Sequence, residues 1–148
     1  MKRRNQIKMT SEEQEQFLRY SRKVALATID QNGFPHVVAM NYVARDGAIL
    51  MSSYGKAQKV VNIRRNPKVG VMAESGRTYG ELKGVMIRGE CEIIEEPNAV
   101  AQMMGAIRGR EAGEVPTGAA SSAPKRVILK VIPKKITSWD HSKLGGRY

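Results

Sequence analysis

Short apolar stretches separated by tight-turn sequences constrain the fold of this chain more than any other feature. Residues 24–29 precede the turn sequence Asp30-Gln-Asn-Gly33, and a valine-rich stretch over 35–44 follows it. Asn, Asp and Gly favour hairpins at such a junction because they tolerate the backbone of tight turns. Residues 45–47, Arg-Asp-Gly, form a second turn signal before the apolar stretch 48–53. The pattern predicts three sequential antiparallel strands, a meander that begins the fold.

Three other segments have helical periodicity. Residues 10–21 begin with hydroxyl side chains that can cap a helix, followed by two glutamates that suit its positive end. Residues 56–66 place apolar side chains on one helical side and are followed by a proline. Residues 97–108 open with a proline, as helices often do, and the Gly-, Ala- and Ser-rich residues 109–124 are predicted as a loop.

Strand patterns return over residues 68–73, 84–94 and 125–132, and 84–94 alternates as a strand with one solvated face does. The tail from Pro133 holds the only tryptophan, Trp139. Six strands with short helices predict a mainly β fold, an antiparallel six-stranded barrel with helices at its ends. An open α+β sheet is compatible with the same pattern.

The length of 148 residues allows one hydrophobic core and is too short for two domains of ordinary size. We therefore predict a single domain over 1–148, in which the charged residues 1–9 form a flexible arm. No apolar run approaches the roughly 20 residues that span a bilayer, and no secretory signal is recognisable. These features predict a cytoplasmic protein without a membrane partner.

The chain offers little for metal or thiol chemistry. Cys91 is the only cysteine, and the two histidines, His36 and His141, are far from it in sequence. This spacing matches no zinc site, so no metal is expected. Because Cys91 alternates with charged residues in a strand, we predict a buried, inert thiol.

The net charge of +11 favours an anionic partner, either nucleic acid or a phosphorylated small molecule. The basic residues are dispersed, with tight clusters only at residues 2–4 and 64–65. Aromatic residues are 5% of the chain, which disfavours a nucleic-acid binder that stacks bases. A nucleic-acid binder using Arg3, Arg4, Arg64 and Arg65 remains the alternative to a small-molecule site.

Residues 52–59 are the strongest candidate for an anion site. Ser52 and Ser53 end a strand, Gly55 follows, and Lys56 and Lys59 lie at the start of a predicted helix. Hydroxyls, a helix N-terminus and ammonium groups together suit a phosphate. A capped helix with solvated lysines is the alternative interpretation.

No set of residues for nucleophilic catalysis is recognisable. The two histidines are not accompanied by a G-x-S-x-G turn, and adjacent glutamates such as Glu95 and Glu96 lie near the ends of predicted elements. The residues therefore favour a protein that binds an anionic cofactor and leaves the reaction to it.

Five motifs in order resemble the pyridoxamine 5'-phosphate oxidase-like family of FMN-binding split barrels. They are the A-T-x-x-x-x-G-x-P hairpin at 27–35, the serines at 52–53, and the segments at 59–67, 84–89 and 131–139. The resemblance extends from about residue 10 to the C-terminus. It implies a homodimer that holds FMN, or in one branch a deazaflavin coenzyme, at the subunit interface.

The resemblance also implies the site residues. It assigns the cofactor phosphate to Lys59, with Gln58 and Lys56, and Trp139 to the cover of the site in the partner subunit. Substrate-side candidates are Lys83, His141 and Lys143. The cofactor ring is expected to lie along the second strand and against the serines, at Val38, Ala39, Met40, Asn41, Ser52 and Ser53.

Two departures argue against vitamin B6 oxidation. Residues 36–43 lack the arginine and lysine of the second strand in the true oxidases, and residues 140–146 replace their C-terminal arginine and histidine motif. The segment 79–85 is similar instead to flavin and deazaflavin reductases of the superfamily. The implied function is a flavin-dependent oxidoreductase that transfers hydride to or from a small organic substrate. A deazaflavin-dependent reductase and a non-enzymatic flavin carrier or sensor are the alternatives.

Overall fold

The structure is a computed structural model that describes residues 1–112 and 125–147, without the side chains of 111–112. The loop predicted over 109–124 therefore lies largely outside the described residues. Its first four residues belong to a helix that is longer than predicted. None of the described helices is long and apolar enough to cross a membrane.

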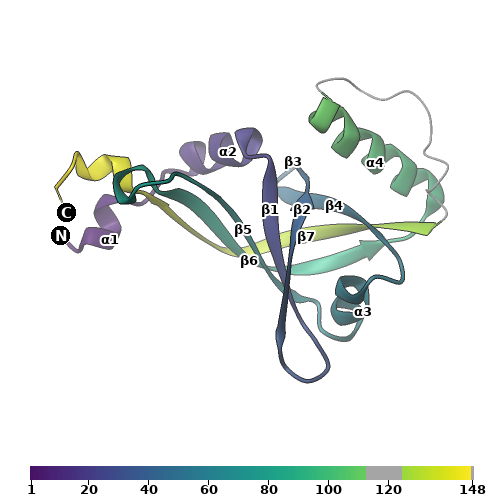
Figure 1. Ribbon diagram of the computed structural model, residues 1–148. Helices are drawn as coiled ribbons and strands as arrows, with labels where there is room; N and C mark the ends of the chain where they lie inside the picture. Colours follow the sequence, from purple (N-terminus) through teal and green to yellow (C-terminus); the bar gives the residue numbers. More distant parts are fainter. Residues whose placement is uncertain (113–124, 148) are drawn as a thin grey trace.

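Seven strands form one sheet in which every neighbouring pair is antiparallel. The strand order is β2-β1-β5-β6-β7-β4-β3 (Figure 1). The strands are β1 (Lys23–Ile29), β2 (Pro35–Asn41), β3 (Val43–Arg45), β4 (Ala48–Tyr54), β5 (Lys68–Ser75), β6 (Lys83–Ile94) and β7 (Arg126–Asp140).

The two outer strands of this order are separated along the chain by Tyr42 alone. β2 pairs with β1 at one end of the sheet, whereas β3 pairs with β4 at the other. The sheet must therefore curl until both ends meet at Tyr42. This curled antiparallel sheet confirms the predicted mainly β split-barrel class. The strand count is seven rather than six because Tyr42 divides the strand predicted over 35–44.

The predicted hairpins are confirmed, and the three predicted strands are neighbours in the predicted order, because residues 35–41 pair with β1 and residues 43–45 pair with β4. Asp46 and Gly47 both have positive φ, at 51° and 77°, as the tight turn between β3 and β4 requires. β2 itself is not paired with β4, whose two neighbours are β3 and β7, so the predicted second strand divides at Tyr42. Turn residues specify a local reversal of the chain and do not specify which further strand completes the sheet.

β7 continues eight residues beyond the predicted end at Ile132. Pro133 was expected to begin a tail, but it lies opposite Gly89 beside a register shift between Arg88 and Gly89. A proline is tolerated in a strand at such an irregularity because the regular hydrogen-bond ladder is already interrupted there. Trp139 therefore belongs to a strand, where it pairs with Gly84.

Helices close the barrel and cover part of its outside (Figure 1). Thr10 caps α2 in a capping box with Glu13, as the sequence predicted for this helix start. In α3, Asn62 donates to Thr28 of β1 at 3.0 Å and so fixes the helix against the barrel. The helices are α1 (Arg3–Gln6), α2 (Ser11–Tyr20), α3 (Gln58–Arg65) and α4 (Pro97–Ala112), with short 3-10 turns η1 (Tyr79–Glu81) and η3 (His141–Leu144).

Two apolar clusters hold these elements together. The larger fills the barrel and includes Leu26, Met51, Val85 and Leu129, all fully buried. The smaller lies between α4 and the outside of the sheet, where it joins strand residues to one side of the helix; it consists of Leu50, Val100, Met104, Ile107 and Ile128.

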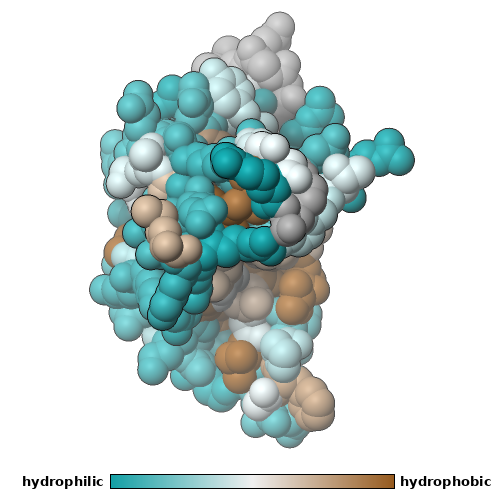
Figure 2. Space-filling model, turned by 90° about the vertical axis from the view of Figure 1, so that its left-hand side faces the viewer, coloured by the Kyte–Doolittle hydropathy of each residue, from teal (hydrophilic) through white to brown (hydrophobic). Residues whose placement is uncertain are grey.

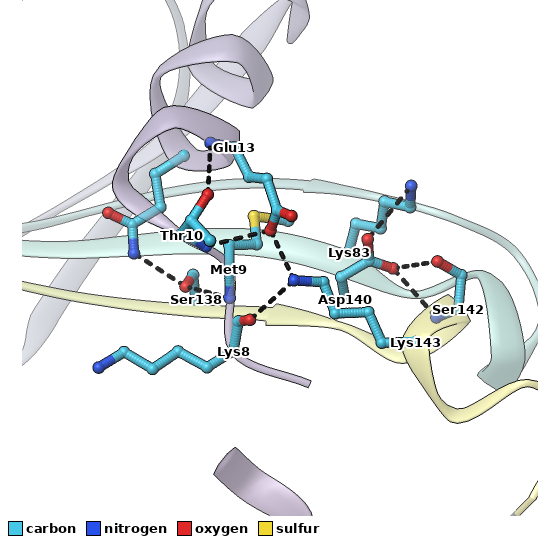
Figure 3. Close-up of polar contacts among 10 residues, drawn as sticks. Lys8, Met9, Thr10, Glu13, Lys83, Ser138, Asp140, Ser142 and Lys143 are labelled. Atoms are coloured by element: carbon cyan, nitrogen blue, oxygen red, sulfur yellow. Dashed lines mark hydrogen bonds and ion pairs between the residues drawn. The ribbon is translucent and has the colours of Figure 1, made fainter. Parts of the chain in front are cut away.

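Lys8 and Met9, at the end of the segment expected as a flexible arm over 1–9, make specific contacts. Met9 is 4% exposed, and its backbone N–H donates to Ser138 Oγ at 3.1 Å. Lys143 pairs with Glu13 at 2.6 Å and donates to the carbonyl of Lys8 at 3.0 Å (Figure 3). These contacts hold the segment beside the end of β7. Figure 2 looks onto this end of the molecule, whose surface is predominantly hydrophilic.

Trp139 provides a direct test of the β6–β7 pairing. A Cβ added to Gly84 would lie 2.2 Å from the Trp139 ring, so Gly84→Ala must displace that ring. We expect a destabilisation of about 1–3 kcal/mol from overpacking. Because Trp139 is the only tryptophan, its fluorescence emission should change as well. Thermal unfolding and emission spectra measure both effects.

Gly105→Ala is the matched control, because an added Cβ meets no atom within 4 Å there. In a helix, alanine is more favourable than glycine by about 1 kcal/mol. This variant should be at least as stable as the original chain, with unchanged emission. A Gly84→Ala protein that matches it in both measurements would contradict the described packing of Trp139.

Candidate functional site

A basic pocket of about 340 Å³ lies where the curled sheet brings β2 close to β4, between α3 and α4. It unites residues from five separate parts of the sequence. Six of them were predicted to bind the cofactor: Ala39, Met40, Asn41, Ser52, Ser53 and Lys59. The pocket is lined by these six and by Lys23, Tyr54, Met104, Ile107, Arg108 and Arg126.

Four predicted cofactor residues do not line the basic pocket. Val38 points to the inner side of β2 and packs against the barrel core. Gln58 donates to Asn62 at 2.7 Å, and Lys56 is exposed. The fourth is Trp139, at the opposite end of β7 from Arg126.

The charge of the basic pocket is entirely positive. Lys23, Lys59, Arg108 and Arg126 line it, and none of its described lining residues is acidic. Burial lowers the pKa of Lys59, and the nearby charge of Arg126 lowers it further. Two adjacent cations without an acid repel each other, and a bound anion removes that cost.

Arg126 is the residue that fits an anion best. Its guanidinium lies 3.9 Å from the centre of the Tyr54 ring and contacts Ser52 Oγ at 3.4 Å. Its Nε is buried and has no hydrogen-bond partner among the described residues. An unsatisfied buried donor typically costs about 1–3 kcal/mol, which an accepting oxygen of a ligand would recover.

Sequence reasoning missed Arg126 and the α4 residues of the pocket. Arg126 enters the site because the antiparallel register places it opposite Tyr54. Arg108 follows the buried Met104 and Ile107 along α4, so the amphipathic pattern of the helix was the only available signal.

Arg110 fixes the end of α4 beside the pocket. Its guanidinium donates to the carbonyls of Arg19 at 2.9 Å, Tyr42 at 3.1 Å and Leu18 at 3.3 Å, and it also contacts the carbonyl of Ser21. It stacks on the Tyr42 ring at 4.4 Å. A cation at the C-terminal end of α2 is favoured by the helix dipole. Arg110 thereby links α4, α2 and the junction of the sheet.

Two of the predicted substrate-side residues, Lys83 and Lys143, lie near Asp140 (Figure 3), and the third, His141, follows Asp140 in the chain. Lys83 pairs with Asp140 at 3.4 Å, and Lys143 is engaged by Glu13. His141 meets the Tyr79 ring edge-on at 4.5 Å. Within one chain, none of the three lines the basic pocket.

An outer face of the sheet connects the two regions; its side chains are mainly small and apolar, and one of its rows ends at the charged Arg88 and Lys135. Its rows follow the strand register across β2, β1, β5, β6 and β7. Val37 is 60% exposed and Met72 36% exposed on this face. Ala39, which lines the basic pocket, lies at the β2 edge of this face. Trp139 lies at the β7 edge of the face, two residues beyond Thr137. We define the outer face as Ala25, Ala27, Val37, Ala39, Gly70, Met72, Met86 and Thr137.

A split barrel with a basic pocket at its junction defines the class of this protein. The family model for pyridoxamine 5'-phosphate oxidase matches residues 10–140. The chain therefore belongs to the pyridoxamine 5'-phosphate oxidase family. Comparison with curated proteins yields no match.

Solved structures agree with this assignment. The chain is similar to the conserved hypothetical protein Rv2991 from Mycobacterium tuberculosis, with 37% identity, a TM-score of 0.91, and coverage of 100% of this chain and 95% of that one. It shares its fold with an F420 reductase at 24% identity and a TM-score of 0.72, covering 86% of this chain and 98% of that one. An FAD-binding protein from Mesorhizobium loti is 20% identical, with a TM-score of 0.69 and coverage of 88% and 94%.

The predicted burial of Cys91 is confirmed. Its side chain is 6% exposed, and burial, with the nearby charge of Glu92, raises the pKa of the thiol to about 12. Only a thiolate reacts readily, so the native protein should react with the disulfide reagent DTNB at pH 8 far more slowly than the protein unfolded in guanidinium. Absorbance of the released product measures both rates. Equal rates would show that the thiol is accessible.

Proposed function

We propose that this chain is a flavin-dependent oxidoreductase that binds FMN in the basic pocket. The observation that carries the proposal is the Lys59–Arg126 pair, two cations with no acid among the described lining residues, in which the buried Nε of Arg126 has no hydrogen-bond partner in the part of the chain that the structure describes. Family membership and structural likeness to an F420 reductase and an FAD-binding protein support a cofactor of the flavin type. A deazaflavin coenzyme is the second candidate, because it also carries a phosphate.

The residues of the pocket have separate tasks in this proposal. Lys59 and Arg126 bind the phosphate, and the Ser52 hydroxyl orients Arg126. Met104 and Ile107 exclude water from one side of the ring, while residues 39–41 support it from β2; Val38 would contribute only its backbone. The bound cofactor supplies hydride transfer to or from a small organic substrate, so no protein nucleophile is needed. Position and electrostatics are the contributions of the chain.

We further propose that two copies pack through the outer face. Val37 and Met72 are exposed apolar side chains in a continuous face, which is typical of an interface. The pocket and Trp139 lie at opposite edges of that face. β5 lies at the centre of the face, and a two-fold axis there would bring the β2 edge of one copy against the β7 edge of the other. Each Trp139, with Lys83 and His141 nearby, would then lie over the pocket of the partner subunit.

A flavin carrier would use the same pocket without turnover. Reduction of an acceptor by catalytic amounts of the FMN-loaded protein, beyond the rate of free FMN, distinguishes an enzyme from a carrier. Nitroaromatic and quinone acceptors cover the common reducible classes. No rate above free FMN with any of them favours the carrier.

Removing either cation of the Lys59–Arg126 pair should weaken FMN binding. A charge-assisted contact contributes about 1.5–3 kcal/mol, so Lys59→Met and Arg126→Met should each raise the Kd about ten- to a hundredfold. Fluorescence quenching of FMN measures the Kd. Lys56→Met is the matched control: this lysine lies three residues away, is exposed and does not line the pocket.

The control should alter the FMN Kd by less than about twofold, since an exposed charge outside the pocket contributes little. Without ligand, Lys59→Met and Arg126→Met should show no loss of thermal stability, because each removes a repulsion between like charges. Lys56→Met should show none because its side chain is exposed. An unchanged Kd in both Lys59→Met and Arg126→Met would show that the phosphate binds elsewhere.

A charge on the outer face should separate the proposed dimer. Met72→Glu places a carboxylate within the proposed interface, whereas Val61→Glu places one at an apolar residue of α3 that is more exposed, 48% against 36%, and lies away from that face. Light scattering after size exclusion should give a monomer for Met72→Glu and a dimer for Val61→Glu and the original chain. Trp139→Ala should retain the dimer and weaken FMN binding. A monomeric original chain with FMN bound would overturn the arrangement.

A further inference from the structure

The basic pocket carries more positive charge than one phosphate neutralises. Its four cations face no described acid. A phosphate monoester carries about −1.5 to −2 charges at pH 7. About two positive charges therefore remain when the phosphate is bound, and in a partly enclosed hollow they favour a second anionic group.

The four cations form two groups that come from different elements. Lys59, at the start of α3, lies close to Arg126, at the start of β7. Lys23 begins β1 and is paired in register with Asn41, whereas Arg108 lies near the end of α4. Neither Lys23 nor Arg108 forms an ion pair with any residue in the part of the chain that the structure describes.

Arg110 joins the two elements that carry the second group. It donates to the carbonyl of Tyr42, the residue after Asn41, and lies 3.5 Å from the carbonyl of Arg22, the residue before Lys23. The last turns of α4, with Arg108, are thus anchored at the start of β1. Arg110 thereby links the elements that carry Lys23 and Arg108, both of which line the basic pocket.

Lys23 also faces open space beyond the pocket. It lines a second hollow of about 900 Å³ beside α2, which also contains Phe17, Glu74 and Lys83. Lys23 therefore borders both hollows, whereas Arg108 lines the basic pocket alone. A group bound by Lys23 is not confined to the size of the basic pocket.

We propose that Lys23 and Arg108 form a second anion-binding subsite, which takes a carboxylate or phosphate distinct from the one held by Lys59 and Arg126. This inference rests on the proposed function, since it assigns the first pair to the cofactor phosphate. The group belongs either to an anionic substrate or to an acidic tail of the cofactor. In both cases the two cationic side chains would bind the anionic group through charge-assisted hydrogen bonds.

The first arm of the test uses the FMN-loaded protein and the probe 4-nitrobenzoate, with neutral 4-nitrobenzamide for comparison. Lys23→Met and Arg108→Met should each weaken nitrobenzoate binding about tenfold and leave nitrobenzamide unchanged. FMN affinity should change less than about threefold in both variants. Lys56→Met controls for the general loss of one charge near the pocket.

The second arm uses the deazaflavin coenzyme with and without its glutamyl tail. If the group belongs to the cofactor, loss of the tail weakens binding about tenfold in the original chain and has no effect in Lys23→Met or Arg108→Met. Either arm alone supports the subsite and identifies its source. Calorimetry at fixed ionic strength measures all affinities, because screening alters such contacts.

Two results would overturn the proposal. In one, both variants bind nitrobenzoate and both forms of the deazaflavin as the original chain does. In the other, Lys23→Met and Arg108→Met lose as much FMN affinity as Lys59→Met, which means that all four cations hold one phosphate. An original chain that binds no flavin contradicts the proposed function instead.

Discussion

The junction at Tyr42 is the constraint on which the rest of this structure depends. Tyr42 connects the two outer strands of the sheet, so the sheet has to curl, and its side chain is 1% exposed. Its hydroxyl donates to the carbonyl of Leu18, and burial raises the pKa of that hydroxyl, which keeps it a neutral donor. Arg110 covers its ring and binds its carbonyl. One residue thus fixes the sheet, α2 and α4 around the basic pocket.

Local signals accounted for most elements of the fold. The turn before Phe34, the capping of α2 by Thr10 and the alternation of β6 are properties of neighbouring residues, and each was predicted correctly. The division of the second strand at Tyr42 and the end of β7 were missed for a common reason. Which strands pair depends on the whole sheet. Pro133 is tolerated only because the pairing with β6 has an irregularity at Gly89. Neither fact is present in the local pattern.

The pocket residues also divide into those that local sequence signals identified and those that they did not. Ser52, Ser53 and Lys59 were found because hydroxyls, a turn and a helix start follow each other within eight residues. Arg126 and Arg108 were not, because each is an ordinary basic residue until strand register or helix packing brings it to the pocket. Residues contiguous in sequence identified where an anion belongs, whereas the strength and number of anionic contacts depend on residues that only the tertiary structure assembles.

Stability and the proposed function are served by different residues of this chain. The barrel cluster and the contacts of Arg110 are complete without a ligand, whereas the pocket keeps like charges together and a donor of Arg126 unsatisfied. Such a pocket slightly destabilises the ligand-free chain, and an anion that binds only the folded state returns that free energy by mass action. The same separation holds for the outer face, whose exposed Val37 and Met72 contribute nothing to the core of one copy. Binding and association are thereby able to change without loss of the fold.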